Sequence, residues 1–334
     1  MSYLAKICIL FTLSLIASLI FTKVLIKLIP KFGIVDHPDI RRTHKKVTPR
    51  GGGITLLIVF TTFFPIFEYT TLSNFYYSPL IMQVFLPISL ISLLDDIIEV
   101  AVSIRLITHL ICSLLAVLWL IQPSTLFHDE LPVYLDLAIA TIGLTVFLNV
   151  YNFLDGIDGI TATESTHLSL TIILLSILRS DIIPNIDFIL ITATILLAFS
   201  LAFLVFNWHP AKIFMGDVGS ISFGFLFGIC LLMIATASER LFVSAVIAAL
   251  YYIADGGLTI LMRLVKGEKI WQAHLNHFFQ KAIKKGKTTY YVIFNILFCN
   301  FILMLLSVSA LYYPIISMGL ALLTVMITLI RLIL

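Results

Sequence analysis

Long apolar runs follow one another through almost the whole chain and are separated by short polar segments. A run of about 20 apolar residues crosses the hydrocarbon core of a bilayer as an α-helix. The pattern therefore predicts an all-α polytopic membrane protein with about eleven transmembrane helices. We expect these helices near residues 4–29, 52–67, 79–94, 104–121, 136–152, 161–179, 187–206, 219–237, 240–262, 289–309 and 312–333.

Composition supports this class, because 60% of the 334 residues are hydrophobic and only 12% are charged. No soluble domain needs that much apolar surface. The sequence shows no soluble appendage, low-complexity linker or internal repeat, so we predict a single integral membrane domain over residues 1–334. The first run is long and ends in Lys23 and Lys27, which favours a retained anchor over a signal peptide.

The basic residues lie unevenly on the two sides that eleven spans define. One side collects 18 of the 21 lysines and arginines, and the other side holds only Lys6, Arg179 and Arg240. Because loops rich in Lys and Arg stay in the cytoplasm, the basic side is predicted to be cytoplasmic. The N-terminus is then outside and the C-terminus inside.

Four polar clusters lie at the predicted cytoplasmic ends of the apolar runs. Ionisable groups at this depth are costly unless they are paired, hydrated or bound to a metal. We therefore predict a polar reaction or transport centre at this face. The clusters are Asp95-Asp96, the segment from Asn149 to Asp158, the segment from Phe214 to Ser220, and the pair His274 and His277.

The first cluster is acidic, because Asp95 and Asp96 are followed by Glu99. This local density of negative charge favours a bound cation. Hard oxygen ligands suit Mg²⁺, which is commonly held by one or two carboxylates together with substrate phosphates. An exposed acidic loop explains an isolated pair of aspartates equally well.

The second cluster places Asn149, Asn152, Asp155 and Asp158 three residues apart, close to one helical turn. The two amides then share one face of a helix, and the intervening glycines let both acids turn into the same cavity. Ordinary turn chemistry at a helix end is the alternative interpretation. Two amides and two acids within ten residues exceed what a helix cap requires.

The third cluster, Phe214-Met-Gly-Asp217-Val-Gly-Ser220, places an acid between glycines directly before an apolar run. Such a segment can bring a carboxylate and backbone N–H groups to a metal–phosphate ligand at a helix N-terminus. Asp217 could equally be the N-cap of the eighth helix. Phe214 could stack on a flat ring or pack against lipid.

The fourth cluster, His274 and His277, lies in the long basic segment before the tenth run, with both rings on one helical face. Contact with a phosphate fits this pair better than zinc, which normally needs more ligands. The alternative is an amphipathic helix on the bilayer surface. Its inserted aromatic residues would be Trp271, Phe278 and Phe279.

A second basic segment, residues 41–50, includes Lys45 and Lys46. Such a segment beside a membrane is usually a topology signal that also attracts anionic lipid. Here it runs directly into three glycines, residues 51–53, and a further apolar run. This continuity suggests a loop whose cations and backbone approach an anionic ligand.

In this order, the motifs resemble those of the polyprenyl-phosphate N-acetylhexosamine-1-phosphate transferase family over about residues 30 to 280. The resemblance implies a Mg²⁺-dependent enzyme of the bacterial inner membrane, with Mn²⁺ as a substitute ion and a periplasmic N-terminus. Such an enzyme moves a sugar-1-phosphate from a UDP-N-acetylhexosamine to undecaprenyl phosphate at the cytoplasmic face and releases UMP. The resemblance implies no nucleic-acid partner and allows a homodimer.

Carried onto this chain, the resemblance assigns catalysis to Asp95, Asp96 and Asp217, with Asp217 and Asp95 as metal ligands. Asp95 or Asp96 would be the base for direct attack by the lipid phosphate, and a covalent aspartyl intermediate is the alternative. Phe214 would stack on uracil, and the histidines would contact the donor's diphosphate or sugar. The expected substrate-binding residues are Lys45, Lys46, Asn149, Asn152, Asp155, Asp158, Phe214, His274 and His277.

Two features concern the branch of the family. Glu99 and the Ala-His-x-x-His-x-x-Gln form of residues 273–280 differ from the peptidoglycan branch and look more like the subgroup that starts O-antigen and related surface glycans. The rival interpretation from another class is a secondary transporter coupled to cations or protons. Such transporters often have paired repeats and broken helices, and the sequence predicts neither.

Overall fold

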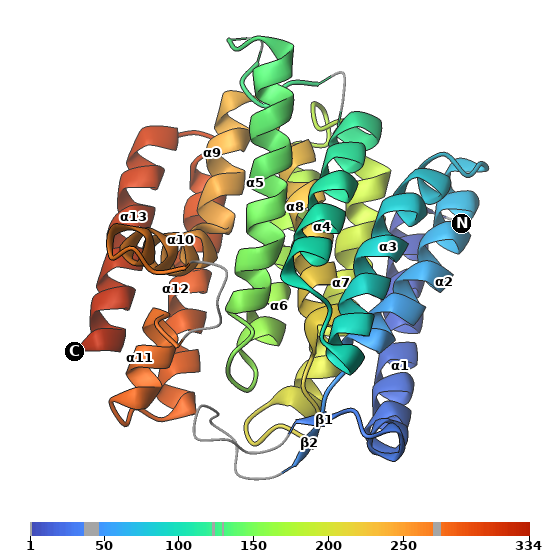
Figure 1. The fold of residues 1–334 in the computed structure, drawn as a ribbon. Helices are drawn as coiled ribbons and strands as arrows, with labels where there is room; N and C mark the ends of the chain where they lie inside the picture. Colours follow the sequence, from blue (N-terminus) through green and yellow to red (C-terminus); the bar gives the residue numbers. More distant parts are fainter. Residues whose placement is uncertain (1, 37–46, 122–123, 129, 270–274) are drawn as a thin grey trace.

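The computed structural model describes residues 2–36, 47–121, 124–128, 130–269 and 275–334. The chain is 78% helical, and most of its helices stand side by side in a bundle (Figure 1). In the described residues, ten helices are long and apolar enough to cross a membrane, or eleven if a bent pair counts as one span. The prediction of an all-α polytopic membrane protein is confirmed.

The elements follow the predicted apolar runs closely, because every run except the ninth supplies one helical span and the polar segments supply the connections. Two short antiparallel strands, β1 and β2, join the first two long helices. The bounds are α1 Tyr3–Leu28, η1 Ile29–Phe32, β1 Val35–Asp36, β2 Thr48–Pro49, α2 Gly53–Leu72, α3 Tyr77–Ile98, α4 Val102–Ala116, η2 Val117–Ile121, α5 Val133–Phe153, α6 Ile160–Leu178, α7 Ile186–Asn207, α8 Asp217–Ala235, α9 Glu239–Ala248, α10 Leu250–Val265, α11 Phe278–Lys284, α12 Thr289–Ser309 and α13 Pro314–Ile333.

Helix α8 forms the centre of the bundle, with 94% of its apolar window buried. It packs against α2, α3, α5 and α9, and it carries apolar residues on every face. A helix that is hydrophobic all round is stable only when other helices surround it. The acidic N-terminus of α8 is therefore held in a fixed position by the surrounding helices.

Glycines on α8 allow this close packing. A Cβ added at Gly224 would lie 2.7 Å from Cα of Leu148, and one at Gly228 would lie 2.4 Å from Cδ1 of Leu144, so α5 approaches the α8 backbone at both positions. Small residues four apart are a common means of bringing membrane helices together. The contact fixes the end of α5 that carries Asn149 and Asn152 beside the start of α8.

The ninth predicted span is not a single helix. Residues 240–262 fall on α9 and α10, which meet at an angle of 71° near Ala249. The expectation that the chain has no broken helix is therefore wrong. Figure 1 shows α10 nearly end-on beside α12 and α13, with α11 below it. This bend turns α10 away from the common direction of the bundle.

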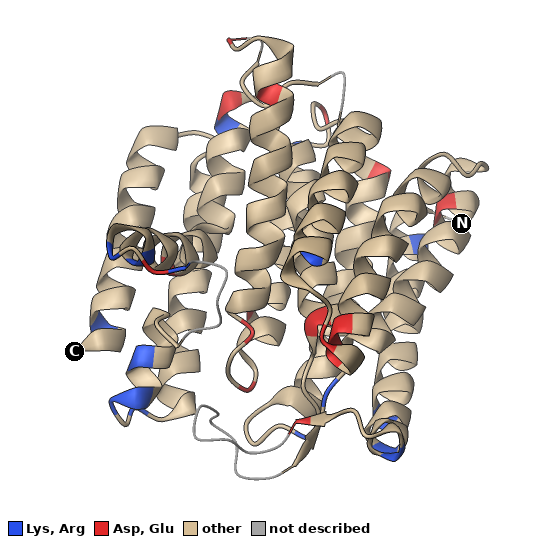
Figure 2. Cartoon of the chain, in the orientation of Figure 1, with Lys and Arg blue, Asp and Glu red and all other residues tan. Residues whose placement is uncertain are grey.

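Most charged residues lie near the ends of the helices, and α10 is an exception. Figure 2 shows basic residues near the lower ends of α1 and α11 and along α10, and acidic residues at the lower end of α3. The strands β1 and β2 lie at the same end of the bundle (Figure 1). The candidate site lies at this end.

Candidate active site

The backbone after β2 pairs with the segment that precedes α8, which unites two of the predicted motifs. The N–H of Phe214 donates to the carbonyl of Pro49 (2.8 Å), and the N–H of Gly52 donates to the carbonyl of Phe214 (2.9 Å). A Cβ added at Gly53 would lie 2.1 Å from Cα of Gly219, so the two chains touch at the level of the backbone. The glycines are needed because no side chain fits between these segments.

Asp96 fixes the start of α8. Its two carboxylate oxygens accept the backbone N–H groups of Asp217 (2.9 Å) and Val218 (3.0 Å), and its side chain is fully buried. The first N–H groups of a helix have no partner within the helix, so a carboxylate there satisfies them and interacts favourably with the helix dipole. Arg50 Nε also contacts Asp96, at 2.9 Å.

Asp217 is the first residue of α8, and Gly216 is its N-cap. The interpretation of Asp217 as a side-chain N-cap is therefore wrong, and its carboxylate is available for other contacts. Arg50 Nη2 lies 2.5 Å from one oxygen, and Arg105 Nη1 lies 3.4 Å from the other. Arg105 also pairs with Asp95. Two arginines thus share three carboxylates.

The charges in this cluster affect one another. Burial lowers the pKa of the Arg50 guanidinium, but the carboxylates of Asp217 and Asp96 outweigh burial and hold this pKa above its ordinary value. Arg105 was not predicted as a site residue. An arginine inside the first turns of an apolar helix was the available signal, since such charges mark functional positions.

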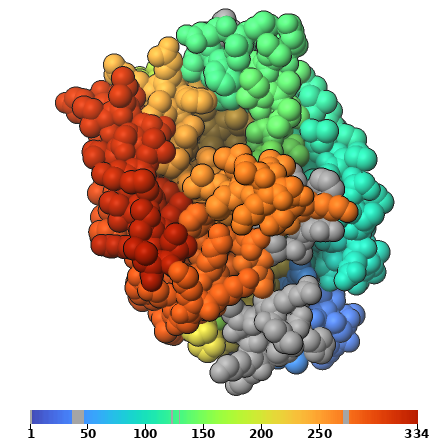
Figure 3. Space-filling model, turned by 60° about the vertical axis from the view of Figure 1, so that its left-hand side comes forward, coloured from blue at the N-terminus to red at the C-terminus, as the bar shows by residue number. Residues whose placement is uncertain are grey.

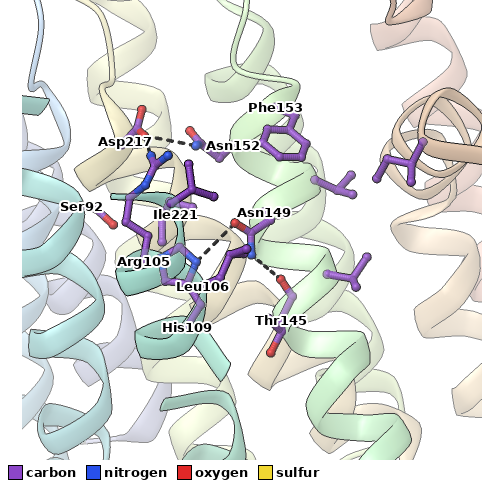
Figure 4. A pocket seen from close by; sticks show the side chains of 14 residues that line it. Ser92, Arg105, Leu106, His109, Thr145, Asn149, Asn152, Phe153, Asp217 and Ile221 are labelled. Carbon is purple, nitrogen blue, oxygen red and sulfur yellow. Dashed lines mark hydrogen bonds and ion pairs between the residues drawn. The ribbon is translucent and has the colours of Figure 1, made fainter. Parts of the chain in front are cut away.

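An apolar hollow with a volume of about 220 Å³ opens beside Asp217, between α4 and α5. Figure 4 shows Arg105 and His109 from α4 facing Asn149 and Asn152 from α5. Most of the remaining lining is aliphatic. The lining residues include Val102, Leu106, Val146, Val150, Ile221 and Ile260.

The asparagines of α5 have defined orientations. Asn149 donates from Nδ2 to the carbonyl of Thr145 (2.7 Å), so its Oδ1 faces Nδ1 of His109 at 3.3 Å. Because an amide oxygen only accepts, His109 carries its proton on Nδ1. Asn152 accepts from Ser220 Oγ (2.6 Å) and donates to Asp217 (3.3 Å). His109 is buried and had not been predicted as a site residue.

A polar hollow with a volume of about 310 Å³ lies on the other side of Asp217. It shares Asn152 and Asp217 with the apolar hollow, so the two volumes meet at these residues. The polar hollow contains the predicted residues Asp155, Asp158 and Phe214. It also contains four polar residues that were not predicted as site residues, namely Asp36, Arg50, Asn207 and Gln280.

Asp155 and Asp158 line the polar hollow but are held differently. Asp155 accepts from Thr161 Oγ1 (2.5 Å), and burial raises its pKa to about 7. The Thr161 hydrogen bond opposes this shift, and the nearby Asp217 carboxylate adds to it. Asp158 is engaged by His209 Nδ1 (2.7 Å) and by the N–H of Ala211 (3.0 Å). Asp158 thus holds the segment before Phe214 in place.

Of the remaining predicted residues, Asp95, Asp96 and His277 are described and line neither hollow. Lys45, Lys46 and His274 lie outside the described residues. His277 is described and is 1% exposed, with its Nδ1 3.2 Å from Oδ1 of Asp255 on α10. Asp255, which lies in the middle of an apolar run, was not identified from the sequence.

The amphipathic-helix interpretation is wrong for Phe279, because α11 begins at Phe278 and the Phe279 ring is fully buried in the protein, whereas Trp271 lies outside the described residues. Phe279 packs inside the molecule and does not insert into a bilayer.

The oxygen ligands of the site suit Mg²⁺ only if substrate phosphates supply further ligands. In the described part of the chain, no group of three or more His, Cys, Asp or Glu side chains could hold a metal ion. The side chains of Asp95 and Asp217 are partly exposed, at 12% and 14%, and offer oxygen ligands. Mg²⁺ accepts one or two carboxylates when phosphate oxygens complete its shell. The residues present fit that arrangement.

Comparison with known proteins defines the class. Residues 78–236 match the family model of glycosyl transferase family 4. A phospho-N-acetylmuramoyl-pentapeptide-transferase of Caldicellulosiruptor bescii is 30% identical over 293 residues, which cover 80% of this chain and 87% of that protein. A probable undecaprenyl-phosphate N-acetylglucosaminyl 1-phosphate transferase of Bacillus subtilis is 27% identical over 287 residues, which cover 81% of this chain and 76% of that protein.

These matches, together with the membrane bundle, identify a multi-span membrane transferase. The chain belongs to the polyprenyl-phosphate hexosamine-1-phosphate transferase family. Its members transfer a phospho-sugar from a UDP-sugar to a polyprenyl phosphate. The predicted family is confirmed, and the matches to known proteins give no support to the transporter interpretation.

Proposed function

We propose that this protein transfers an N-acetylhexosamine-1-phosphate from a UDP-sugar to undecaprenyl phosphate and releases UMP. The product is the diphosphate-linked lipid that starts a surface polysaccharide such as O-antigen. The observation that carries this proposal is the position of Asp217, whose carboxylate borders both an apolar hollow and a polar hollow. A reaction between a lipid and a nucleotide sugar needs such a junction.

The two substrates fit different hollows. The apolar hollow, between α4 and α5, suits the start of a polyprenyl chain, with Arg105 next to the lipid phosphate. The polar hollow suits the nucleotide sugar, with Arg50 next to its diphosphate. Arginine is well suited to both tasks because its planar guanidinium binds phosphate oxygens through two N–H groups. Both arginines contact Asp217, so phosphates bound to them would lie near one another.

The chemistry consists of one displacement. An oxygen of the lipid phosphate attacks the donor's β-phosphorus, and the bond from that phosphorus to the bridging oxygen breaks, so UMP leaves with the electron pair. The second pKa of a phosphate monoester is near 6, so the nucleophile loses its proton readily at neutral pH. Mg²⁺, bound through Asp217 and Asp95, would neutralise charge so that two phosphates can approach. Positioning and charge therefore account for most of the catalysis.

The contacts of Asp95 and Asp96 indicate different roles for the two adjacent aspartates. Asp96 is fully buried and accepts the first N–H groups of α8, so we assign it a positioning role. Asp95 is partly exposed and accepts from the N–H of Val100 (2.7 Å) and from Arg105. We propose Asp95 as the base and as the second oxygen ligand. Asp155, with its raised pKa, would lie beside the donor's sugar or nucleotide.

The site is proposed to face the cytoplasm of a bacterial inner membrane, with a periplasmic N-terminus. Support comes from the basic residues, which gather around the lower ends of α1 and α11 and along α10 (Figure 2). Loops and helix ends that are rich in lysine and arginine remain on the cytoplasmic side. UDP-sugars are made in the cytoplasm, so a donor site on this side is reachable.

Release of UMP by the purified protein tests the proposal. The assay contains Mg²⁺, undecaprenyl phosphate and a panel of UDP-N-acetylhexosamines that includes 6-deoxy forms. We expect lipid-dependent release with at least one donor, and its loss in Asp217→Asn. Asp181→Asn is the matched control, because Asp181 is an exposed carboxylate between α6 and α7. Full turnover by folded Asp217→Asn would refute the metal assignment.

A further inference from the structure

A buried carboxylate that the reaction does not use lies on α10, in the second half of the bent span. The Asp255 side chain is fully buried and receives three donors. Oδ1 accepts from His277 Nδ1 (3.2 Å) and from the N–H of Phe278 (3.0 Å), and Oδ2 accepts from the Tyr251 hydroxyl (3.2 Å). Burying a carboxylate in an apolar helix is costly, so these contacts must be well satisfied.

Two of the three donors belong to the start of α11. His277 is the N-cap of this helix, and its backbone N–H donates to Gln280 Oε1 at 3.2 Å, which closes a capping box. Such a cap fixes the direction in which the chain enters a helix. Asp255 therefore attaches the first turn of α11 to α10. Figure 3 shows these two helices next to one another on the face where α10 crosses the molecule.

The first turn of α11 in turn packs on the loop that carries Asp155. A Cβ added at Gly156 would lie 2.8 Å from Cζ of the Phe279 ring and 3.3 Å from Gln280 Nε2. Gln280 and Leu275 line the polar hollow, whereas His277 does not. The position of this wall of the hollow thus depends on how α11 is held.

We propose that Asp255 and His277 are positioning residues for the nucleotide-sugar donor. Their contact holds the first turn of α11 against the loop at Gly156 and so sets the wall of the polar hollow. His277 acts through Phe279 and Gln280 and does not touch the donor. The inference rests on the proposed function in one respect, namely that the polar hollow receives the UDP-sugar.

Steady-state kinetics with each substrate varied in turn tests the inference. Asp255→Leu removes both carboxylate oxygens that accept hydrogen bonds. We expect the KM for the UDP-sugar to rise about 10-fold or more, because the wall of the polar hollow formed by α11 shifts. The KM for undecaprenyl phosphate should stay within about twofold, since the apolar hollow does not touch α11. Asp255→Asn retains an acceptor oxygen and should restore most of the donor affinity.

Tyr251→Phe is the matched control. This variant removes the hydroxyl that donates a hydrogen bond to Oδ2 of Asp255 and leaves both contacts with α11 in place. Its KM for the UDP-sugar should therefore equal that of the parent. A role in global stability alone would lower the folded fraction of Asp255→Leu without changing the KM of the folded enzyme. An unchanged donor KM in Asp255→Leu would overturn the inference.

Hydrogen exchange of residues 278–284 separates this inference from the proposed function. Faster exchange in Asp255→Leu, with α12 unchanged, supports the role of Asp255 even if no donor is turned over by the parent, a result that would refute only the proposed function. Unchanged exchange in α11 overturns the inference. If Asp255→Leu does not fold, His277→Leu is measured in the same way, with the same two outcomes.

Discussion

The two adjacent aspartates at the end of α3 should respond differently to truncation. Asp96→Ala leaves the N–H groups of Asp217 and Val218 without the carboxylate that accepts them. A buried donor without a partner costs about 1–3 kcal/mol, so two of them cost about 4 kcal/mol. Arg50 keeps Asp217 as a partner, so it adds little to this cost.

Asp95→Ala is the matched variant, with the same substitution one residue earlier. Asp95 is partly exposed and accepts one backbone N–H, from Val100. Water can reach this position in part, so we expect a cost of about 1 kcal/mol. Both variants should lose transferase activity, because Asp96 positions Asp217 and Asp95 is the proposed base.

The assay is thermal unfolding of both purified variants in the same detergent. For a chain of this size, a loss of about 1 kcal/mol lowers the Tm by roughly 2 °C. We therefore expect Asp96→Ala to lower the Tm by roughly 8 °C and Asp95→Ala to lower it by roughly 2 °C. Equal shifts for the two variants would refute the view that Asp96 fixes the start of α8.

Three further predictions concern single side chains. His109→Gln keeps an N–H group that can donate to Asn149 Oδ1 and should retain the parent's KM for undecaprenyl phosphate. His109→Leu should raise that KM about 10-fold without changing the KM for the UDP-sugar. Equal KM values for undecaprenyl phosphate in both variants would contradict the role of this hydrogen bond. Gly156→Ala places a methyl group against the Phe279 ring and should raise the KM for the UDP-sugar. Gly143→Ala, where an added Cβ meets no atom within 4 Å, should leave that KM unchanged, and steady-state kinetics on both variants measure the difference. Glu164→Gln should leave the Tm within about 2 °C of the parent, because glutamine still accepts from Asn300 Nδ2 (2.6 Å) and avoids burying a charge; a large fall in Tm would show that the carboxylate's charge is needed.

The fold was predictable because a bilayer imposes a simple rule on sequence. Every predicted apolar run except the ninth gave one helical span at the expected place, and the central position of α8 follows from its apolar residues on every face. The bend between α9 and α10 was not predictable from the same rule. Residues 239–265 contain no proline, and the two adjacent glycines lie several residues after the break.

The candidate site was predictable in its motifs but not in its contacts. The expected meeting of Asp95-Asp96, Asn152 and Asp217 follows from polar groups at the ends of neighbouring helices, where they avoid lipid. The difference between Asp95 and Asp96 was hidden, because successive residues on a helix point about 100° apart and the sequence does not give the direction of α8. Asp255 was missed because its partner, His277, lies on another helix.

The fate of the donor's β-phosphate tests the central claim most directly. The purified protein is given undecaprenyl phosphate, Mg²⁺ and a UDP-N-acetylhexosamine labelled with ³²P in the β-phosphate. Transfer of a sugar-1-phosphate predicts that the label enters the lipid fraction in equal amount to the UMP released, and that Asp217→Asn abolishes both. Label that remains in the aqueous fraction as UDP, while the sugar enters the lipid, would contradict the account.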